Sequence, residues 1–467
     1  MSLTRTEHDL LGDHEVPAEV YYGVHTARAC ENFPISGVPI SRHTDLVIAL
    51  ASVKQAAAQA NLQLGQLDPQ IAEAIIAACV DIRGGALHDQ FVVDQIQGGA
   101  GTSTNMNANE VIANRALEIL GRPRGDYGRI HPLEHVNLGQ STNDVYPTAV
   151  KVGLGMAARA LEAALRGLAQ RCAAKSVEFA DLLKLGRTQL QDAVPMTLGQ
   201  EFGAFAVTVI EDADRLGEAM ALIAEINLGG TAIGTGLNTH PQYAGLVCEQ
   251  LRQITGLPLT TAGDLVEATS DCGSFVQLSG VTKRAAVKLS KICNDLRLLS
   301  SGPRAGLGEI NLPAVQAGSS IMPGKVNPVI PEMVNQVAFE VIGNDLTITM
   351  AAEAGQLQLN AFEPIIARAL LSSLNHLTAA VEVLGERCIE GITANADRMR
   401  EAVLGSASIA TALNPVLGYE AATALVAEAI ATGSSIPDLV RRSALLDEAV
   451  LVRMLSPENL CRPNELR

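Results

Sequence analysis

Residues 202–223, FGAFAVTVIEDADRLGEAMALI, carry the pattern that decides the fold class of this chain. Apolar side chains recur in it every three or four positions, which is the period of an amphipathic α-helix with one buried face. A helix of about 20 residues is ~30 Å long, so this face needs another long helix beside it. The apolar positions are Phe205, Val209, Ala213, Leu216, Met220 and Ile223.

Two further stretches, residues 152–172 and 281–299, repeat this stepping. Alternating β-branched runs are few, and no βαβ rhythm is present, so the strand signal is weak. We therefore expect an all-α, mainly helical fold: a long central helix bundle with small N- and C-terminal domains. Changes in texture along the chain predict an N-terminal domain over 1–140, a central bundle domain over 141–395 and a small C-terminal helical domain over 396–467.

The composition excludes several classes of protein. With 34 Lys and Arg against 50 Asp and Glu, the 467-residue chain has a formal charge of −16, which does not suit a phosphate backbone as partner. Apolar residues reach 48% but aromatic residues only 3%, so the core must consist of Ala, Leu, Ile and Val in closely packed helices. The apolar stripes are so continuous that we expect a homo-oligomer with a shared helical core.

The cysteines and the N-terminus indicate a cytoplasmic protein. No two of the eight cysteines lie within 20 residues of one another, which excludes a zinc knuckle or a CxxC motif and fits reduced thiols. The N-terminal segment has no apolar core typical of a signal peptide. The uncharged stretch 226–248 contains several glycines and Pro241, which is typical of a loop and not of a membrane span.

Sequence patterns for phosphate and metal binding fail on inspection. Gly98-Gly99-Ala100-Gly101 lacks both the dinucleotide-binding spacing and a following Gly-Lys-Ser/Thr. His131-Pro132-Leu133-Glu134-His135 matches a zinc-binding pattern literally. However, proline favours the first position of a helix, so we interpret His131 as a helix cap. We predict no metal and no organic cofactor.

Four polar segments at the edges of the helical patterns carry uncharged hydrogen-bond donors beside small residues. Taken singly, each fits an ordinary helix cap. Together their hydroxyls, amides and one lysine, with few carboxylates, fit a pocket for a small anion. The segments are GTSTN (101–105), QSTND (140–144), GRTQLQD (186–192) and GSSIMPGKVNP (318–328).

The last of these segments resembles the signature of the aspartase/fumarase superfamily, whose members eliminate a group β to a carboxylate and release fumarate. The resemblance covers nearly the whole chain. It implies a homotetramer with a central helical bundle, in which each active site takes its segments from three subunits. Further matching motifs are VPAEVYYGVHT, QGGAGTSTNMN, GQSTND, GRTQLQDAVPMTLGQE, NLGGTAIGTGLNT, SKICNDLRLLSSGPRAGL and AAEAGQLQLN.

The resemblance also implies a role for individual residues. Ser319 would be the catalytic base, in a tight loop whose backbone N–H groups converge on it. Hydroxyl groups would surround the reacting carboxylate, a lysine and an amide would hold the other one, and two amides would contact the leaving amino group. In that order these substrate-binding residues are Thr102, Ser141, Thr142 and Thr188; Lys325 and Asn327; and Asn143 and Gln189, with Ser320 beside the base.

Gln189 distinguishes two activities within the superfamily. Fumarases usually carry histidine in its place, because expelling hydroxide from malate requires delivery of a proton. Ammonia leaves from an ammonium group that already holds its proton, so a neutral glutamine suffices. We therefore expect a carbon–nitrogen lyase that reversibly eliminates ammonia from L-aspartate to give fumarate. The alternatives are a fumarate hydratase acting on L-malate and a non-catalytic homologue.

Overall fold

The computed structural model describes residues 3–463, and it confirms the mainly helical fold class. The described residues form two compact units, the first made of residues 3–163, 213–286 and 337–378 and the second of residues 164–212, 287–336 and 379–463. The predicted division into three consecutive domains stays a prediction. None of the described helices is both long and apolar enough to cross a membrane.

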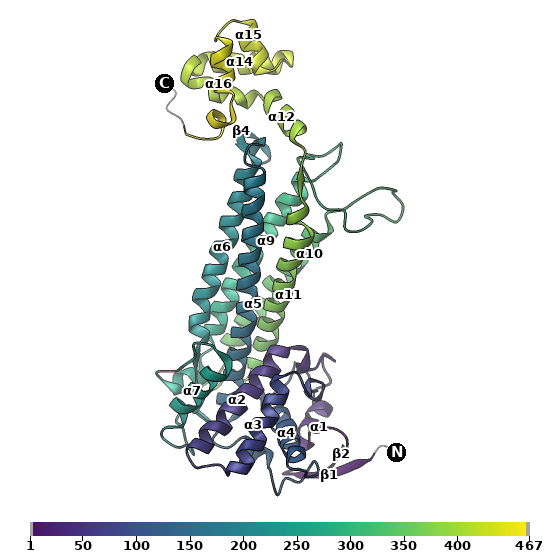
Figure 1. The fold of residues 1–467 in the computed structure, drawn as a ribbon, viewed down its shortest axis with the longest axis vertical. Helices are drawn as coiled ribbons and strands as arrows, with labels where there is room; N and C mark the ends of the chain where they lie inside the picture. The colour runs from purple at the N-terminus through teal and green to yellow at the C-terminus, as the bar shows by residue number, and fades with distance from the viewer. Residues whose placement is uncertain (1–2, 464–467) are drawn as a thin grey trace. The chain divides into compact units, whose positions relative to one another are not determined.

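Five long helices each contribute residues to both units. They carry the labels α5, α6, α9, α10 and α11 in Figure 1. The three periodic stretches of the sequence lie inside three of these helices, as predicted. Each helix places its apolar stripe in the core: Phe205, Val209 and Leu216 are almost fully buried. The five are α5 (Thr142–Glu178), α6 (Leu198–Ile223), α9 (Gly273–Leu299), α10 (Val329–Glu353) and α11 (Glu363–Arg387).

In the first unit, small side chains allow the helices to pack closely. Helix α2 (Thr44–Gln63) packs against α3 (Pro69–Arg83) and α7 (Tyr243–Thr255), and α3 packs against α4 (Thr102–Ile119). Alanine therefore fills much of this core, in place of the aromatic residues found in other cores. The fully buried alanines of α2 are Ala49, Ala51, Ala56, Ala57 and Ala60.

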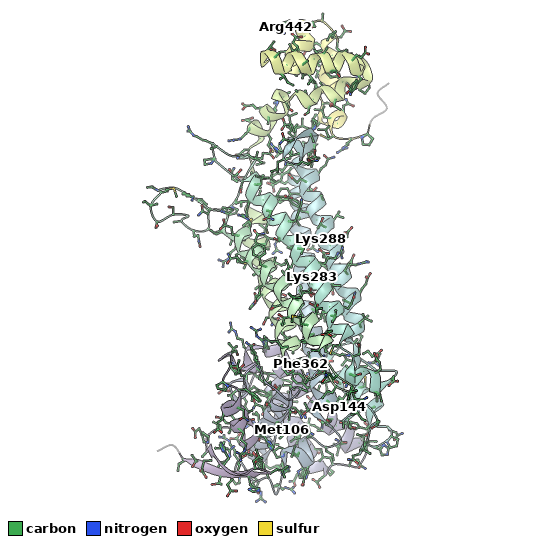
Figure 2. All side chains as sticks on the ribbon, turned by 180° about the vertical axis from the view of Figure 1, so that it is seen from behind. Met106, Asp144, Lys283, Lys288, Phe362 and Arg442 are labelled. Carbon is green, nitrogen blue, oxygen red and sulfur yellow. The ribbon has the colours of Figure 1, made fainter. Side chains whose placement is uncertain are left out.

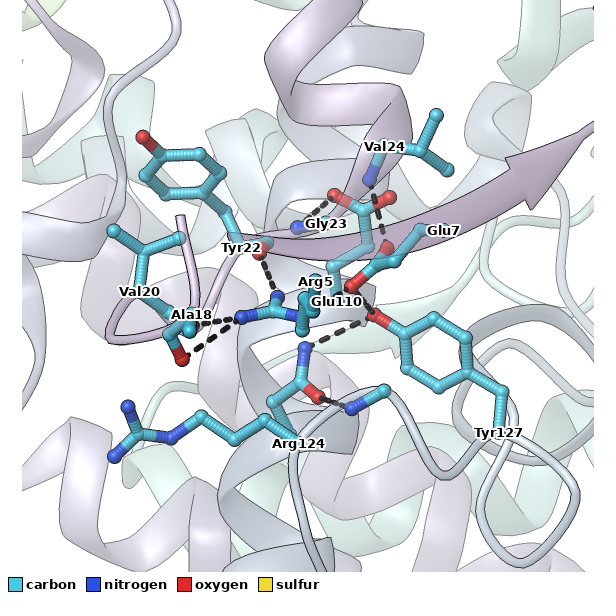
Figure 3. Close-up of polar contacts among 12 residues, drawn as sticks. Arg5, Glu7, Ala18, Val20, Tyr22, Gly23, Val24, Glu110, Arg124 and Tyr127 are labelled. Carbon is cyan, nitrogen blue, oxygen red and sulfur yellow. Dashed lines mark hydrogen bonds and ion pairs between the residues drawn. The ribbon is translucent and has the colours of Figure 1, made fainter. Parts of the chain in front are cut away.

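An antiparallel hairpin that the sequence pattern did not predict, β1 (Thr4–Asp9) and β2 (Gly12–Pro17), precedes α1 (Val24–Asn32). Figure 3 shows how buried carboxylates hold α1 in place. Glu110 accepts hydrogen bonds from the N–H groups of Gly23, His25 and Thr26 at 2.8–3.1 Å, and Glu7 accepts one from Val24 at 2.9 Å. Burial raises the pKa of Glu110 to about 7.

The second unit contains a second unpredicted hairpin, β3 (Leu183–Thr188) and β4 (Gln191–Thr197). Leu185 of β3 joins a core built from the C-terminal helices. This core also contains buried side chains of each of those helices, including Val403, Leu425, Leu439 and Leu451. The helices are α12 (Ala396–Gly405), α14 (Tyr419–Thr432), α15 (Ile436–Arg442) and α16 (Glu448–Met454).

Candidate active site

The segment 140–144 leads into α5 in the first unit, and its Asp144, labelled in Figure 2, is fully buried. This carboxylate accepts hydrogen bonds from the N–H groups of Ser141 at 2.9 Å, Gly229 at 3.0 Å and Thr231 at 2.9 Å. Burial raises the pKa of Asp144, although these backbone hydrogen bonds oppose the shift. Ser141 and Thr142 are consequently held half-exposed at the surface of the unit.

Asn143 is anchored to the same glycine-rich segment. Its Nδ2 donates to the carbonyl oxygen of Ala232 at 2.7 Å, and Nδ2 of Asn227 donates to the carbonyl oxygen of Asn143 at 3.0 Å. Because the amide nitrogen is bound to Ala232, the orientation of the side chain is set. Its Oδ1 then serves as a hydrogen-bond acceptor, which is the group that an ammonium ion needs.

Thr102 is exposed at the first position of α4, and a close approach of two helices brings it near α5. Gly101 has a φ of 89°, and a Cβ there would lie 2.3 Å from Cγ of Tyr146, so only glycine fits. One turn further along α4, Nδ2 of Asn105 donates to Oγ1 of Thr142 at 3.2 Å. The structure thus brings two of the four polar segments together in the first unit.

A buried lysine lies behind these segments. Lys54 of α2 is fully buried, and its Nζ donates to Oδ1 of Asn137 at 2.8 Å and to Oε1 of Gln140 at 2.9 Å. Burial lowers its pKa to about 7, since the apolar surroundings disfavour the charged form. Lys54 was not among the residues predicted from the sequence. A single lysine within the apolar run ALASVKQAAA was the signal that could have revealed it.

In the second unit, the segment 318–328 folds back on itself as a loop. The N–H of Gly318 donates to the carbonyl oxygen of Lys325 at 2.8 Å, and Nδ2 of Asn327 donates to the carbonyl oxygen of Gly318 at 2.6 Å. A Cβ at Gly318 would lie 2.7 Å from that lysine oxygen, so the closure requires glycine. Lys325 and Asn327 also line a cavity of about 560 Å³.

Two backbone N–H groups converge on the Ser319 hydroxyl, the arrangement that was expected around a catalytic base. Oγ of Ser319 accepts hydrogen bonds from the N–H of Ile321 at 3.2 Å and of Met322 at 2.9 Å. Such donors stabilise negative charge on the oxygen. Ser319 itself is half-buried, whereas Ser320 and Lys325 are exposed.

Thr188 and Gln189 lie at the tip of the β3–β4 hairpin, also in the second unit. Thr188 pairs with Gln191, so Gln189 and Leu190 form a two-residue turn. Their φ angles are 53° and 63°, in the left-handed region that favours glycine or asparagine. All three side chains from Thr188 to Leu190 are exposed.

A cluster of buried charges supports this hairpin. Glu309 is 2% exposed and forms ion pairs with Nζ of Lys184 at 2.9 Å and with Nη1 of Arg187 at 2.6 Å. Both cations belong to β3, and Arg187 directly precedes Thr188 in the chain. Glu309 was not predicted from the sequence, because it is distant from the hairpin in the chain and has no local signature.

The predicted site residues therefore divide between the units. Thr102, Ser141, Thr142 and Asn143 belong to the first unit. The second unit holds the remaining six: Thr188, Gln189, Ser319, Ser320, Lys325 and Asn327. His131 lies in the first unit and caps a short helical turn, as predicted, since its Nδ1 accepts from the N–H groups of Leu133 and Glu134.

Comparisons with known proteins show which family the chain resembles. A family described as "Lyase" matches residues 12–343, and one described as "Fumarase C C-terminus" matches residues 409–462. The aspartate ammonia-lyase of Pseudomonas aeruginosa is 60% identical over 461 residues, covering 98% of this chain and 97% of that protein. The aspartate ammonia-lyase of Escherichia coli K12 is 53% identical over 460 residues, covering 98% and 96%.

Solved structures are similar over the full length. A crystal structure described as "fumarate lyase:delta crystallin" from Brucella melitensis, bound to cobalt, has a TM-score of 0.96 and 58% identity, covering 99% of this chain and 100% of that one. The class II fumarase of Schistosoma mansoni has a TM-score of 0.92 and 34% identity, again covering 99% and 100%.

Proposed function

The chain belongs to the lyase family of the aspartase/fumarase superfamily, and we propose that it catalyses the reversible elimination of ammonia from L-aspartate to give fumarate. The observation that carries the proposal is identity of 52–60% with aspartate ammonia-lyases over nearly the whole chain. The class II fumarase is only 34% identical. Gln189 at the hairpin tip, where fumarases usually have histidine, favours the same activity.

The chemistry begins with removal of a proton from the carbon next to one carboxylate of the substrate. Ser319 takes this proton as the base. Its oxygen can carry negative charge because the N–H groups of Ile321 and Met322 already point at it. The C–H electrons move into the adjacent carboxylate, which becomes a doubly negative aci-carboxylate.

Neutral hydroxyl groups stabilise this intermediate. Donors that are already in position when charge develops are the largest single contribution to such reactions. Hydroxyls are suited to this role because they donate without neutralising the charge that must form. The groups assigned to it are Thr102, Ser141, Thr142 and Thr188.

Other side chains orient the substrate. Lys325 and Asn327 hold the second carboxylate, with Ser320 beside them. One N–H of the Asn327 amide is bound to Gly318, and its second N–H remains for the substrate. Oδ1 of Asn143 and Oε1 of Gln189 accept from the departing ammonium group.

A homotetramer with sites shared by three subunits would unite the residues of the two units. Helix α10 supports an assembly of this kind, because a line of large apolar side chains on it is exposed. Their spacing of three and four residues places them on one helical face. Burial of this face against other subunits would remove it from water. The exposed side chains are Phe339 at 63%, Ile342 at 40%, Leu346 at 63% and Met350 at 64%.

The cytoplasm is the compartment that fits the chain. All eight cysteines are unpaired, and six of them are buried. Free thiols persist in a reducing environment.

A single assay tests the proposal. The purified protein is incubated with L-aspartate or with L-malate while the absorbance of fumarate is followed. We expect fumarate from aspartate only. Fumarate from malate would identify a fumarate hydratase, and no fumarate from either substrate would identify a non-catalytic homologue.

A further inference from the structure

A cavity of about 390 Å³ lies in the first unit, apart from the residues assigned to catalysis. The segment before α2 and Gln95, which precedes α4, line one part of it, and helices α10 and α11 line the rest. Its volume is in the range of pockets that bind small molecules. The lining residues with charged or polar groups that matter here are Arg42, His43, Gln95, Glu340, Arg368 and His376.

Two arginines in this cavity have no partner of opposite charge. Across residues 3–463, neither Arg42 nor Arg368 forms an ion pair or a side-chain hydrogen bond. Nε of Arg368 is moreover buried without any hydrogen-bond acceptor. A buried guanidinium N–H without a partner is unfavourable, so the cavity lacks an acceptor that these groups need.

The other lining groups do not supply this acceptor. Glu340 is the only carboxylate in the lining, and its Oε2 is already 2.9 Å from Nδ1 of His376. Nε2 of His43 contacts Oε1 of Gln95 at 3.1 Å. Burial lowers the pKa of His43, and the neighbouring Arg368, His376 and Arg42 oppose its protonation further. A neutral His43 leaves the two arginines as the dominant charges.

We propose that this cavity binds a small dianion through carboxylate or phosphate oxygens, with Arg42 and Arg368 as its principal ligands. Planar guanidinium groups bind both kinds of oxygen in a bidentate manner. Ser372 and Asn375, which also line the cavity, add neutral donors. The site shares no residue with the candidate active site, so it is independent of the proposed function.

Binding of two probe anions to the full-length protein tests the site. Isothermal titration with inorganic phosphate and, separately, with succinate is performed on the wild type, Arg42→Gln, Arg368→Gln and Arg368→Lys. Arg215→Gln is the matched control, because this substitution removes the same charge outside the cavity. Arg215 is exposed and pairs with Glu218. Arg42 is itself exposed, so its replacement is tolerated even if Arg368→Gln does not fold.

We expect each Gln variant to bind one of the two anions with an affinity lower by about tenfold or more. This change corresponds to the loss of one charge-assisted contact. Arg368→Lys should fall between these variants and the wild type, and Arg215→Gln should match the wild type. An effect on phosphate alone identifies a phosphate ligand, and an effect on succinate alone identifies a dicarboxylate. Succinate bound at the active site would be retained in all variants.

Two results would overturn the proposal. One is equal affinity for both anions in all five proteins, including no binding in any of them. The other is a changed oligomeric mass in Arg368→Gln with unchanged anion affinity, which would mean that a carboxylate of another subunit fills the cavity. Both readouts are independent of turnover, so a failure of the proposed activity leaves this test intact.

Discussion

Nδ2 of Asn327 donates to the carbonyl oxygen of Gly318 at 2.6 Å, and this hydrogen bond closes the loop that carries Ser319. The same side chain is assigned to the substrate carboxylate. In its proposed role, Asn327 would thus link the shape of the loop to the position of the substrate.

Asn327→Ala should lower kcat/KM by ~10² or more. The substitution removes a hydrogen-bond donor to the substrate, and it also removes the hydrogen bond that closes the loop. Limited proteolysis should cut the variant faster within residues 318–328. Steady-state kinetics and proteolysis of the same preparation check both effects. Unchanged proteolysis with reduced kcat/KM would restrict Asn327 to substrate binding.

Ser319→Ala should abolish turnover while the fold and substrate affinity are retained, since only the base is lost. Fumarate production and binding of L-aspartate by titration are the measurements. Ser443→Ala, at an exposed serine in the C-terminal part of the chain, is the control. Activity within about tenfold of the wild type would remove Ser319 from the role of base.

Thr188→Val deletes one hydroxyl and keeps the shape of the side chain. If the hydroxyl stabilises the aci-carboxylate, kcat should fall by ~10²–10³. The exposed Thr423→Val of α14 serves as control. A change confined to KM would instead show that the hydroxyl binds substrate and transition state equally.

Glu309 is a positioning residue, because it holds the β3–β4 hairpin that carries Thr188. Glu309→Gln should therefore affect catalysis through the hairpin. Losing one member of a buried ion cluster destabilises a protein by ~3–5 kcal/mol, and Lys184 retains Glu201 as a partner. We expect a lower melting temperature and a lower kcat with little change in KM. Glu309→Asp should restore part of both. A loss of stability with normal kcat would separate this cluster from catalysis.

Glu110→Gln tests the buried carboxyl at the start of α1. The folded pKa of about 7 exceeds the ordinary 4.5, so Glu110 favours folding most below pH 4.5. Its contribution is lost as the pH rises through 7, because the carboxyl group ionises less readily in the folded state. This contribution to the free energy of unfolding is at most ~3 kcal/mol. Urea unfolding gives the free energy of unfolding at pH 5 and at pH 8. The difference between these two values should be smaller for the variant than for the wild type. The control is Glu218→Gln, at an exposed position. If the free energy of unfolding changed equally between pH 5 and pH 8 in both variants, the prediction would be contradicted.

The helical fold was predictable because the long helices bury one continuous face, and burial of a face leaves a period of 3.6 in the sequence. Residues 202–223 illustrate this, since they lie within α6. The two hairpins were not predictable in this way. Strand β1 (TRTEHD) contains no apolar residue, and in β3 (LKLGRT) the apolar alternation stops after Leu185, so neither strand carries a clear period-two pattern.

The candidate site was predictable as a set of polar segments but not as a geometry. Resemblance named Ser319, and the contacts of its hydroxyl with Ile321 and Met322 then follow from the local turn. Lys54 and Glu309 are different, because each acts on a segment more than 80 residues away. No local pattern records a contact of this range.

The turn at Gln189 and Leu190 places two side chains where the backbone prefers glycine or asparagine. Such a conformation costs ~1–2 kcal/mol per residue, which a sequence selected for heat resistance alone would avoid. Directed evolution towards thermal tolerance should therefore enrich Asn and Gly at these positions and return slower catalysts. With Gln189 in its proposed role, substitutions that stabilise the hairpin tip would also slow the reaction.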